Sequence, residues 1–226
     1  MGAFLHAATQ LAISLQKSRT TEKTRTHHKR LKQHRVPSSR PSDVEMRLYD
    51  RAGRRLYLNR AERKQFARSA RAESPAMYLL CLTLLYTGCR ISEALALTPQ
   101  SFQRSSLSLS LVTLKRRRPG VVREIPVPRD LFAALDRVPE APTSRLFPVH
   151  RATAWRMVKA VLARASISGA QAMPKGLRHG FGVNAIQCGV PLNLLARWMG
   201  HANMKTTAIY ADATGPEERQ IAARMW

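Results

Sequence analysis

The sequence predicts a mainly α-helical domain with one small antiparallel β-hairpin, an α+β arrangement. From about residue 56, most segments begin with a helix-capping residue or proline, and several end at glycine. Only residues 106–115 alternate apolar and polar residues as a half-buried strand does, and a basic turn and a second short strand segment follow. Apolar residues make up 44% of the 226, which is enough for a core and excludes a wholly disordered chain.

Capping signals predict the first helices. Asn59 is placed to cap a helix that runs through Arg71, and Glu62, three residues on, completes a capping box. After the next helix, the segment RISEALAL (90–97) predicts another, which ends before Pro99.

The helix between these two is expected to be buried. Pro75 opens it, its sequence AMYLLCLTLLYTG is apolar almost all round, and Gly88 ends it. Its nearly apolar part, residues 76–86, is about half the length of a membrane span and contains Thr83. We therefore expect a core helix and no membrane segment.

The strand pair comes next. In SLSLSLVTLK (106–115) the strict alternation places three leucines on one face, Leu107, Leu109 and Leu111. RRRPG (116–120) turns the chain, and VVREIPV (121–127) returns as the second strand.

More helices complete the domain. Their expected ranges are Arg129–Arg137, Ala152–Ala165, Lys175–Gln187, Pro191–Met199, about Met204–Ala211, and a short last helix from Pro216 with Glu217 and Glu218 in its first turn.

Charge points to a polyanionic partner. Lys and Arg number 38 against 14 Asp and Glu, a net charge of +24, and such an excess most often serves nucleic acid. Nine of these cations fall in residues 17–43, where Leu31 and Val36 are the only aliphatic residues. We expect a flexible basic arm there, with a solvated linker as the alternative, and before it an amphipathic helix or frayed tail. A packaging protein would show the same charge.

Cys81, Cys89 and Cys188 are an odd number without a close pair. They predict neither a disulfide framework nor a metal site, and they suit a reducing, cytoplasmic setting.

Four places concentrate polar residues against an apolar background. TGCRISEAL contains Arg90 and Glu93, three apart on one helix, and the hairpin carries Lys115 before its three arginines. PKGLRHGF sets two cations and a histidine on one helical face, and WMGHANMKTTAIY sets a histidine nine residues before a tyrosine: Lys175, Arg178, His179, His201 and Tyr210.

Such groups, if they converge, suit phosphoryl transfer. Arginine forks, lysine and histidine would hold the oxygens of a phosphodiester and favour its transition state. A tyrosine hydroxyl is a possible nucleophile, and a lysine could protonate the leaving alkoxide. No carboxylate cluster suits Mg²⁺, so the cations would replace a metal. Singly, each residue also has an ordinary structural interpretation: an Arg90–Glu93 ion pair, a solvated Lys115, a turn residue His201, a packed Tyr210.

In these ordered motifs the chain resembles the catalytic domain of the tyrosine recombinases, the phage integrase family, from about residue 61 to residue 211. The resemblance implies a site-specific DNA recombinase, an integrase or resolvase of a mobile element, that cuts and rejoins DNA through a 3′-phosphotyrosyl link without metal or cofactor. It implies the catalytic set Arg90, Lys115, Lys175, Arg178, His201 and Tyr210, with Glu93 orienting the first arginine, His179 packing behind or hydrogen-bonding to the site, and Arg116, Arg117, Arg118 and Lys205 binding DNA.

Two departures from the family pattern qualify this interpretation. Lys175 stands where the family usually has histidine, so its role stays open. Residues 1–55 form a basic arm in place of a full helical DNA-clamping domain; either the arm replaces that half, or an accessory protein supplies it, or the chain is a remnant. The resemblance implies double-stranded DNA and a homo-oligomer, a tetramer on DNA, as partners. A catalytically impaired DNA-binding regulator is the alternative function.

The expected parts are therefore the arm (1–55), the catalytic domain (56–212) and a C-terminal helix (213–226). On that helix Ile221 and Met225 lie one turn apart, with Trp226 next in sequence. This small apolar stripe could pack on its own domain or, as we favour, dock in trans on a neighbouring protomer.

Overall fold

The computed structural model describes residues 47–113, 120–138, 141, 143–213 and 215–225. The expected helix or tail at the N-terminus and the basic arm up to residue 46 lie outside the described residues. So does the hairpin turn with Lys115, Arg116, Arg117 and Arg118.

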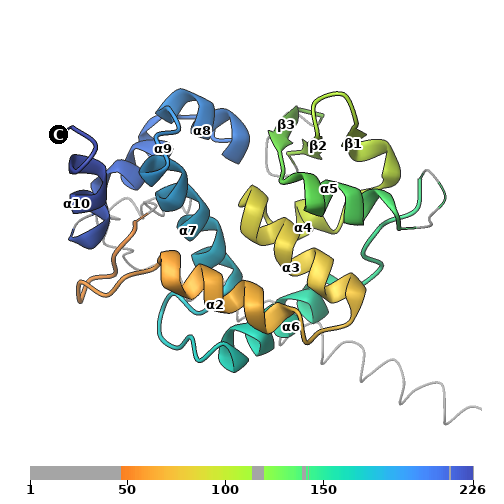
Figure 1. Ribbon diagram of the computed structural model, residues 1–226, viewed down its shortest axis with the longest axis horizontal. Helices are drawn as coiled ribbons and strands as arrows, with labels where there is room; N and C mark the ends of the chain where they lie inside the picture. Colours follow the sequence, from red (N-terminus) through yellow and green to blue (C-terminus); the bar gives the residue numbers. More distant parts are fainter. Residues whose placement is uncertain (1–46, 114–119, 139–140, 142, 214, 226) are drawn as a thin grey trace, which may run out of the picture. The chain divides into compact units, whose positions relative to one another are not determined.

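The mainly helical fold with a small antiparallel sheet is confirmed (Figure 1). The helices are α2 (Arg60–Ala70), α3 (Pro75–Thr87), α4 (Ile91–Ala94), α5 (Arg129–Asp136), α6 (Arg151–Arg164), α7 (Pro174–Gln187), α8 (Leu192–Met199), α9 (Lys205–Ala208) and α10 (Pro216–Ala222). Two 3-10 turns, η2 (Pro99–Ser101) and η3 (Ile209–Asp212), and the strands β1 (Phe102–Gln103), β2 (Ser108–Val112) and β3 (Val122–Pro126) complete the described elements.

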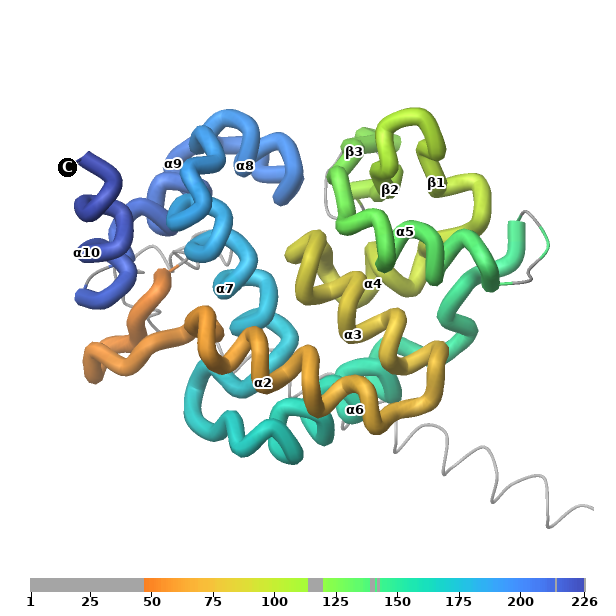
Figure 2. Tube along the Cα trace, in the orientation of Figure 1, coloured from red at the N-terminus to blue at the C-terminus, as the bar shows by residue number. Residues whose placement is uncertain are grey.

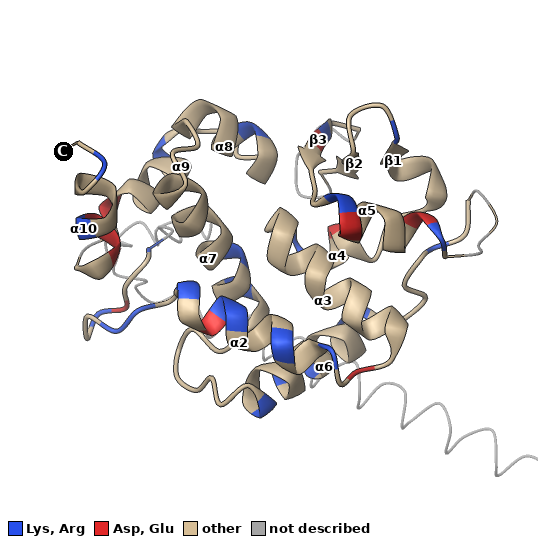
Figure 3. Ribbon diagram, in the orientation of Figure 1, with Lys and Arg blue, Asp and Glu red and all other residues tan. Residues whose placement is uncertain are grey.

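Helices α2 and α3 pack on each other but differ in polarity, as expected. The predicted capping box is present: the Asn59 side chain accepts from the Glu62 amide, and the Glu62 carboxylate accepts from the Asn59 amide. Cationic residues recur along α2, whereas α3 has none (Figure 3). Gly88 ends α3 in the left-handed conformation, at φ 59°.

The sheet has three strands in the order β1-β2-β3, one more than the hairpin that we expected. Leu109 pairs with Ile125 and Leu111 with Arg123, and all four side chains are buried. The prediction for Leu107 was wrong: at φ 48° it precedes the strand and is only partly buried, and its carbonyl accepts from the Val127 amide.

Helix α7 passes between two groups of elements (Figure 2). It contacts α2, α3 and α6 along one part and α8, η3 and α10 along another. Its residue Leu177 belongs to the main core, and Phe181 and Val183 belong to a second cluster that also contains Tyr210. Residues near the middle of α7 therefore lie where the two clusters meet.

Two expected helices are shorter than their sequence signals. The segment 90–97 is α-helical only over α4, and beyond it the amides of Ala96 and Leu97 donate three residues back, to the Glu93 and Ala94 carbonyls, in tighter turns. The segment 204–211 divides into α9 and η3, four residues each. Helix α10 packs on α7 of its own chain; its docking in trans stays a prediction.

Candidate active site

Arg90 lies at the N-terminus of α4, where the local sequence fixes its orientation. The Glu93 carboxylate accepts from the Arg90 amide at 2.9 Å and from its guanidinium at 2.7 Å, the pairing predicted from their spacing. Glu93 is fully buried, whereas 28% of the Arg90 side chain stays exposed. Burial raises the pKa of Glu93, but Arg123, the Arg90 amide and the Arg90 charge outweigh it and leave the pKa below its ordinary value.

Arg178, on α7, is buried and tied to backbone carbonyls. Its Nη1 donates to the Gly88 carbonyl at 2.7 Å, and its Nη2 donates to the Met199 carbonyl at 2.7 Å. The guanidinium therefore joins the ends of α3 and α8 to the middle of α7. Burial, and next the charge of Arg90, lower its pKa to about 10, so it remains a cation at neutral pH.

His201 follows α8, which Gly200 ends in the left-handed conformation. Its Nε2 lies 3.1 Å from Arg178 Nη2 and its Nδ1 lies 2.8 Å from Thr207 Oγ1. Since a guanidinium only donates, Nε2 accepts and Nδ1 carries the proton that Thr207 accepts. Burial, and then the positive charge of Arg178, lower the pKa of His201 to about 3, which makes it a neutral imidazole in neutral solution.

Tyr210, in η3, is fully buried beside these groups. Its ring stacks on the His201 ring, with centroids 6.2 Å apart, and its hydroxyl lies 3.2 Å from Nδ1 of His179. Burial raises the pKa of Tyr210 to about 12, although the charges of Arg178 and Arg90 oppose the shift. The expected nucleophile is thus next to the cations but covered, with its hydroxyl bound to His179.

A glycine in α7 makes room for this ring. A Cβ atom at Gly182 would lie 2.5 Å from Tyr210 Cε1. Gly180 has a different neighbour, because a Cβ there would lie 2.5 Å from the Leu58 carbonyl oxygen. Glycine inside a helix costs about 1 kcal/mol relative to alanine, so both positions serve close packing rather than helix formation.

The remaining predicted residues are not gathered in the same way. Lys175, in the first turn of α7, and Lys205, at the start of α9, are both exposed. Lys175 stands on the helix of Arg178 and contributes to lowering the pKa of His179, after burial. His179 is buried against Tyr210, with an Nε2 atom that has no hydrogen-bond partner in the described part of the chain.

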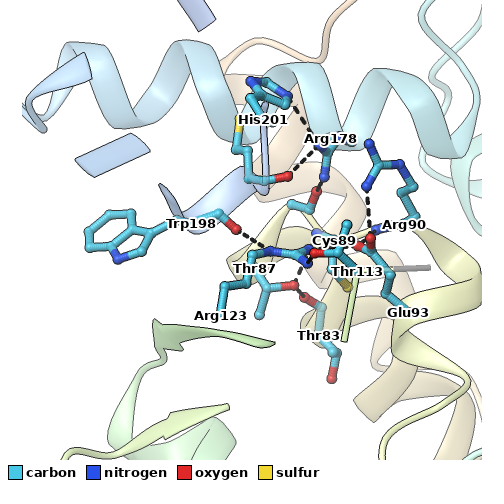
Figure 4. A network of polar contacts seen from close by, with 12 residues as sticks. Thr83, Thr87, Cys89, Arg90, Glu93, Thr113, Arg123, Arg178, Trp198 and His201 are labelled. Atoms are coloured by element: carbon cyan, nitrogen blue, oxygen red, sulfur yellow. Dashed lines mark hydrogen bonds and ion pairs between the residues drawn. The ribbon is translucent and has the colours of Figure 1, made fainter. Parts of the chain in front are cut away.

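Sequence analysis missed Arg123, which joins the site from β3. Its guanidinium donates to Glu93, to Thr113 Oγ1 and to the Trp198 carbonyl (Figure 4). The signal that could have identified it is strand alternation: Arg123 is two residues from the buried Ile125, so it points to the core face.

This arrangement can bind a phosphodiester. Arg90 has exposed surface for an anion, and Arg178 and His201 lie directly beside each other. Forked guanidinium donors match phosphate oxygens, and a partly buried site strengthens their charge interaction. In the described ranges no three His, Cys, Asp or Glu side chains gather as a metal site would require. No helix among these residues is long and apolar enough to cross a membrane.

Comparison with known proteins decides the family. The model of the Phage integrase family matches residues 56–216, well over half of the chain. The chain belongs to the phage integrase family. The match covers all elements that hold Arg90, Arg178, His201 and Tyr210.

Curated relatives in this family are recombinases of the Xer type. The chain is 26% identical over 161 residues to Tyrosine recombinase XerA of Pyrococcus furiosus, covering 65% of the chain and 53% of that protein. It is 31% identical over 157 residues to Tyrosine recombinase XerD of Mycobacterium tuberculosis, covering 62% of the chain and 49% of that protein. The chain thus spans about half the length of the curated relatives that it matches.

Solved structures agree on the fold. The crystal structure of XerA recombinase superposes with a TM-score of 0.65 at 22% identity, covering 75% of this chain and 64% of that one. The Tn1549 transposon integrase in complex with circular intermediate DNA superposes with a TM-score of 0.56 at 21% identity, covering 75% and 67%. The fold is therefore that of a tyrosine recombinase catalytic domain.

Proposed function

We propose that the protein is a site-specific DNA recombinase that cuts and rejoins double-stranded DNA through a 3′-phosphotyrosyl intermediate. The observation that carries this proposal is the gathering of Arg90, Arg178 and His201 beside Tyr210. Membership of the phage integrase family and the similarity to Xer recombinases support it.

In this proposal the two arginines hold the non-bridging oxygens of the scissile phosphate. Tyr210 Oη attacks the phosphorus, the bond to the 5′ oxygen breaks, and a 3′-phosphotyrosine forms. When Arg178 turns its Nη2 from His201 to the phosphate, Nε2 of the neutral imidazole becomes free to take up the proton of the phenol, and Lys115 protonates the departing 5′ oxygen. Attack by a 5′-hydroxyl of the partner strand reverses these steps, so the reaction needs no external energy source.

The buried position of Tyr210 adds a requirement. Its hydroxyl is bound to His179 and its ring is fully covered, so it must leave this position before it can reach DNA. The segment that carries it consists of two four-residue elements, α9 and η3, and such short elements are easily rearranged. We propose that DNA binding accompanies the release of Tyr210.

The partners follow from the same proposal. Lys205, with the hairpin arginines Arg116, Arg117 and Arg118, would contact DNA phosphates, whose binding weakens steeply with salt. Exchange between two duplexes requires four cleavages, which favours a tetramer on DNA. The basic arm or an accessory protein would close the other side of the duplex, and α10 would link protomers. The alternative of an impaired DNA-binding regulator is not favoured, because Arg90, Arg178 and Tyr210 are all present.

A suicide substrate tests the proposal. Sites are first selected from random duplexes by binding and then nicked beside the expected cleavage position, so that the released fragment diffuses away and the covalent adduct accumulates. Wild-type protein should form an adduct without metal, and Tyr210→Phe should reduce it by at least about 10³-fold. The matched control is Tyr86→Phe, at a tyrosine that is 37% exposed on α3, which should leave the adduct unchanged. An adduct that survives Tyr210→Phe, or none on any selected site, would refute the proposal.

A further inference from the structure

We propose that Arg123, on strand β3, is a positioning residue for strand cleavage. It holds Arg90, through Glu93, and the end of α8, before His201, in one fixed arrangement. This inference rests on the proposed function and deepens it.

Arg123 joins three elements through three different nitrogen atoms (Figure 4). Nη2 donates to Glu93 Oε2 at 2.7 Å, Nη1 to Thr113 Oγ1 at 2.9 Å, and Nε to the Trp198 carbonyl at 2.6 Å. Only 3% of the side chain is exposed. Its three contacts therefore point into the protein, and its role must be exerted through the groups that it holds.

The first of these groups is Glu93. This buried carboxylate lies between two guanidinium groups, with Oε1 on Arg90 and Oε2 on Arg123. Arg123 thus fixes the position of the carboxylate, and the carboxylate in turn orients Arg90. Without Arg123, Glu93 would have one guanidinium partner left and more freedom to rotate with it.

The second group is the C-terminal end of α8. The carbonyls that end a helix lack partners within it and carry its negative dipole end. Here two successive ones are bound by buried arginines: Trp198 by Arg123 and Met199 by Arg178. The stem of Arg123 also lies against Gly200, where an added Cβ would be 3.2 Å from its Cδ and Cζ. His201 comes next in the chain, so its position depends on both contacts.

Lysine cannot reproduce this geometry. An ammonium group is a compact donor and lacks the planar fork that serves three acceptors in different directions. Removing one partner of a buried ion pair is strongly destabilising, but lysine keeps a positive charge beside Glu93. The effect of Arg123→Lys on the arrangement of the site is therefore measured separately from its effect on stability.

The test compares Arg123→Lys with Arg63→Lys. Arg63, on α2, is also buried (8% exposed) and donates to the Leu85 carbonyl, but it lies outside the candidate site. For each variant, the adduct rate, the Kd for DNA and the melting temperature are measured. Arg123→Lys should lower the adduct rate about 10- to 100-fold with Kd within about threefold, because small misplacements have such effects. Arg63→Lys should lower the melting temperature without changing the rate of the folded protein.

Two further measurements separate positioning from a general structural defect. On an Arg90→Ala background, Arg123→Lys should lower the adduct rate by clearly less than it does in the wild type, since the part that acts through Arg90 is already lost and only the part that acts through α8 remains. A substrate with a neutral methylphosphonate at the scissile position has no anionic oxygen for Arg90 to hold. On this substrate the difference in adduct rate between wild type and Arg123→Lys should be smaller than on the phosphate substrate. The proposal is overturned if Arg123→Lys lowers the adduct rate by the same factor with and without Arg90 and by the same factor on both substrates. It is also overturned if Arg123→Lys is as active as wild type.

The result remains informative if the proposed function fails. Wild-type protein without adduct on any selected site would refute recombination, and arginine Nε–H NMR signals then test the positioning alone. Arg123→Lys should shift the signals of Arg90 and Arg178, whereas Arg63→Lys should not; unchanged signals would overturn the inference. If Arg123→Lys does not fold, Thr113→Val removes one contact of the network and is expected to give a smaller loss of the same kind. Wild-type rates and signals in that variant would count against the proposal.

Discussion

The site consists of two regions that are held in different ways. Arg90, Arg178 and Arg123 are fixed by a buried carboxylate and by backbone carbonyls at the ends of α3 and α8. Tyr210, in contrast, lies on a four-residue 3-10 turn, and its hydroxyl contacts a histidine side chain. The arginines that would stabilise charge are therefore fixed in place, whereas the tyrosine that would react is buried on a short turn.

Under the proposed function, this difference suits a recombinase that must not cut DNA before its partners assemble. Cations placed in advance stabilise a transition state without a cost of reorganisation. A phenol kept neutral and buried cannot attack, because burial raises the pKa of Tyr210 to about 12 and covers its oxygen. Arg178→Lys tests the fixed arginines, acid tests the two histidines beside the site, and Gly182→Ala tests the buried tyrosine.

Apart from loss of the Tyr210 hydroxyl itself, the largest effect on adduct formation is expected for Arg178→Lys. An ammonium can serve one of the two carbonyls at Gly88 and Met199 but not both, and it cannot also reach His201 as the fork does. Leaving a buried carbonyl without a partner costs about 1–3 kcal/mol in unfolding free energy. Adduct formation should fall by about 10²- to 10³-fold, as when a transition-state donor is removed. Urea unfolding and single-turnover cleavage measure the two effects.

The control is Arg197→Lys, an exposed arginine one turn of α8 away from His201. It should leave both measurements nearly unchanged. If Arg178→Lys behaves like this control, adduct formation does not depend on the fixed arginines of the candidate site.

Local rules explain what the sequence could predict. The capping box of Asn59 and Glu62, the buried helix closed by Gly88 and the Arg90–Glu93 pair each involve residues within a few positions of one another, where spacing dictates contact. The order of the motifs also indicated the family correctly.

Long-range packing explains what it could not. Arg123 was missed because its partners Glu93 and Trp198 are 30 and 75 residues away. The burial of Tyr210 depends on Gly182 of another helix, and the sequence shows no sign that these two residues meet.

The second prediction concerns acid. His179 and His201 both have pKa values lowered to about 3 in the folded chain, chiefly by burial, from an ordinary value of 6.5. Between these values the unfolded chain binds more protons than the folded one, so stability is present above about pH 6.5 and declines as the pH falls toward 3. Each histidine contributes a slope of about 1.4 kcal/mol per pH unit inside that window.

Urea unfolding between pH 7 and pH 4.5 measures this slope. His201→Gln should remove about half of the part of the slope that comes from the two histidines. Equal stability at pH 7 and pH 5 would show that the two imidazoles are not held neutral by the surrounding cations and apolar groups.

The smallest effect is expected for Gly182→Ala, which acts directly on the buried Tyr210. The added methyl group would overlap the Tyr210 ring and must displace it, at a cost of about 1–3 kcal/mol. Once the ring is displaced, the pKa of the Tyr210 phenol should fall from about 12 to near 10. Absorbance titration measures this pKa when the curve of the double variant Gly182→Ala/Tyr210→Phe is subtracted from that of Gly182→Ala. Gly180→Ala is the matched control, since it strains the same helix against Leu58 and not against Tyr210. We expect faster adduct formation only in Gly182→Ala, because release of the phenol then no longer limits attack; equal behaviour of the two variants would mean that Tyr210 is not held back by its packing on α7.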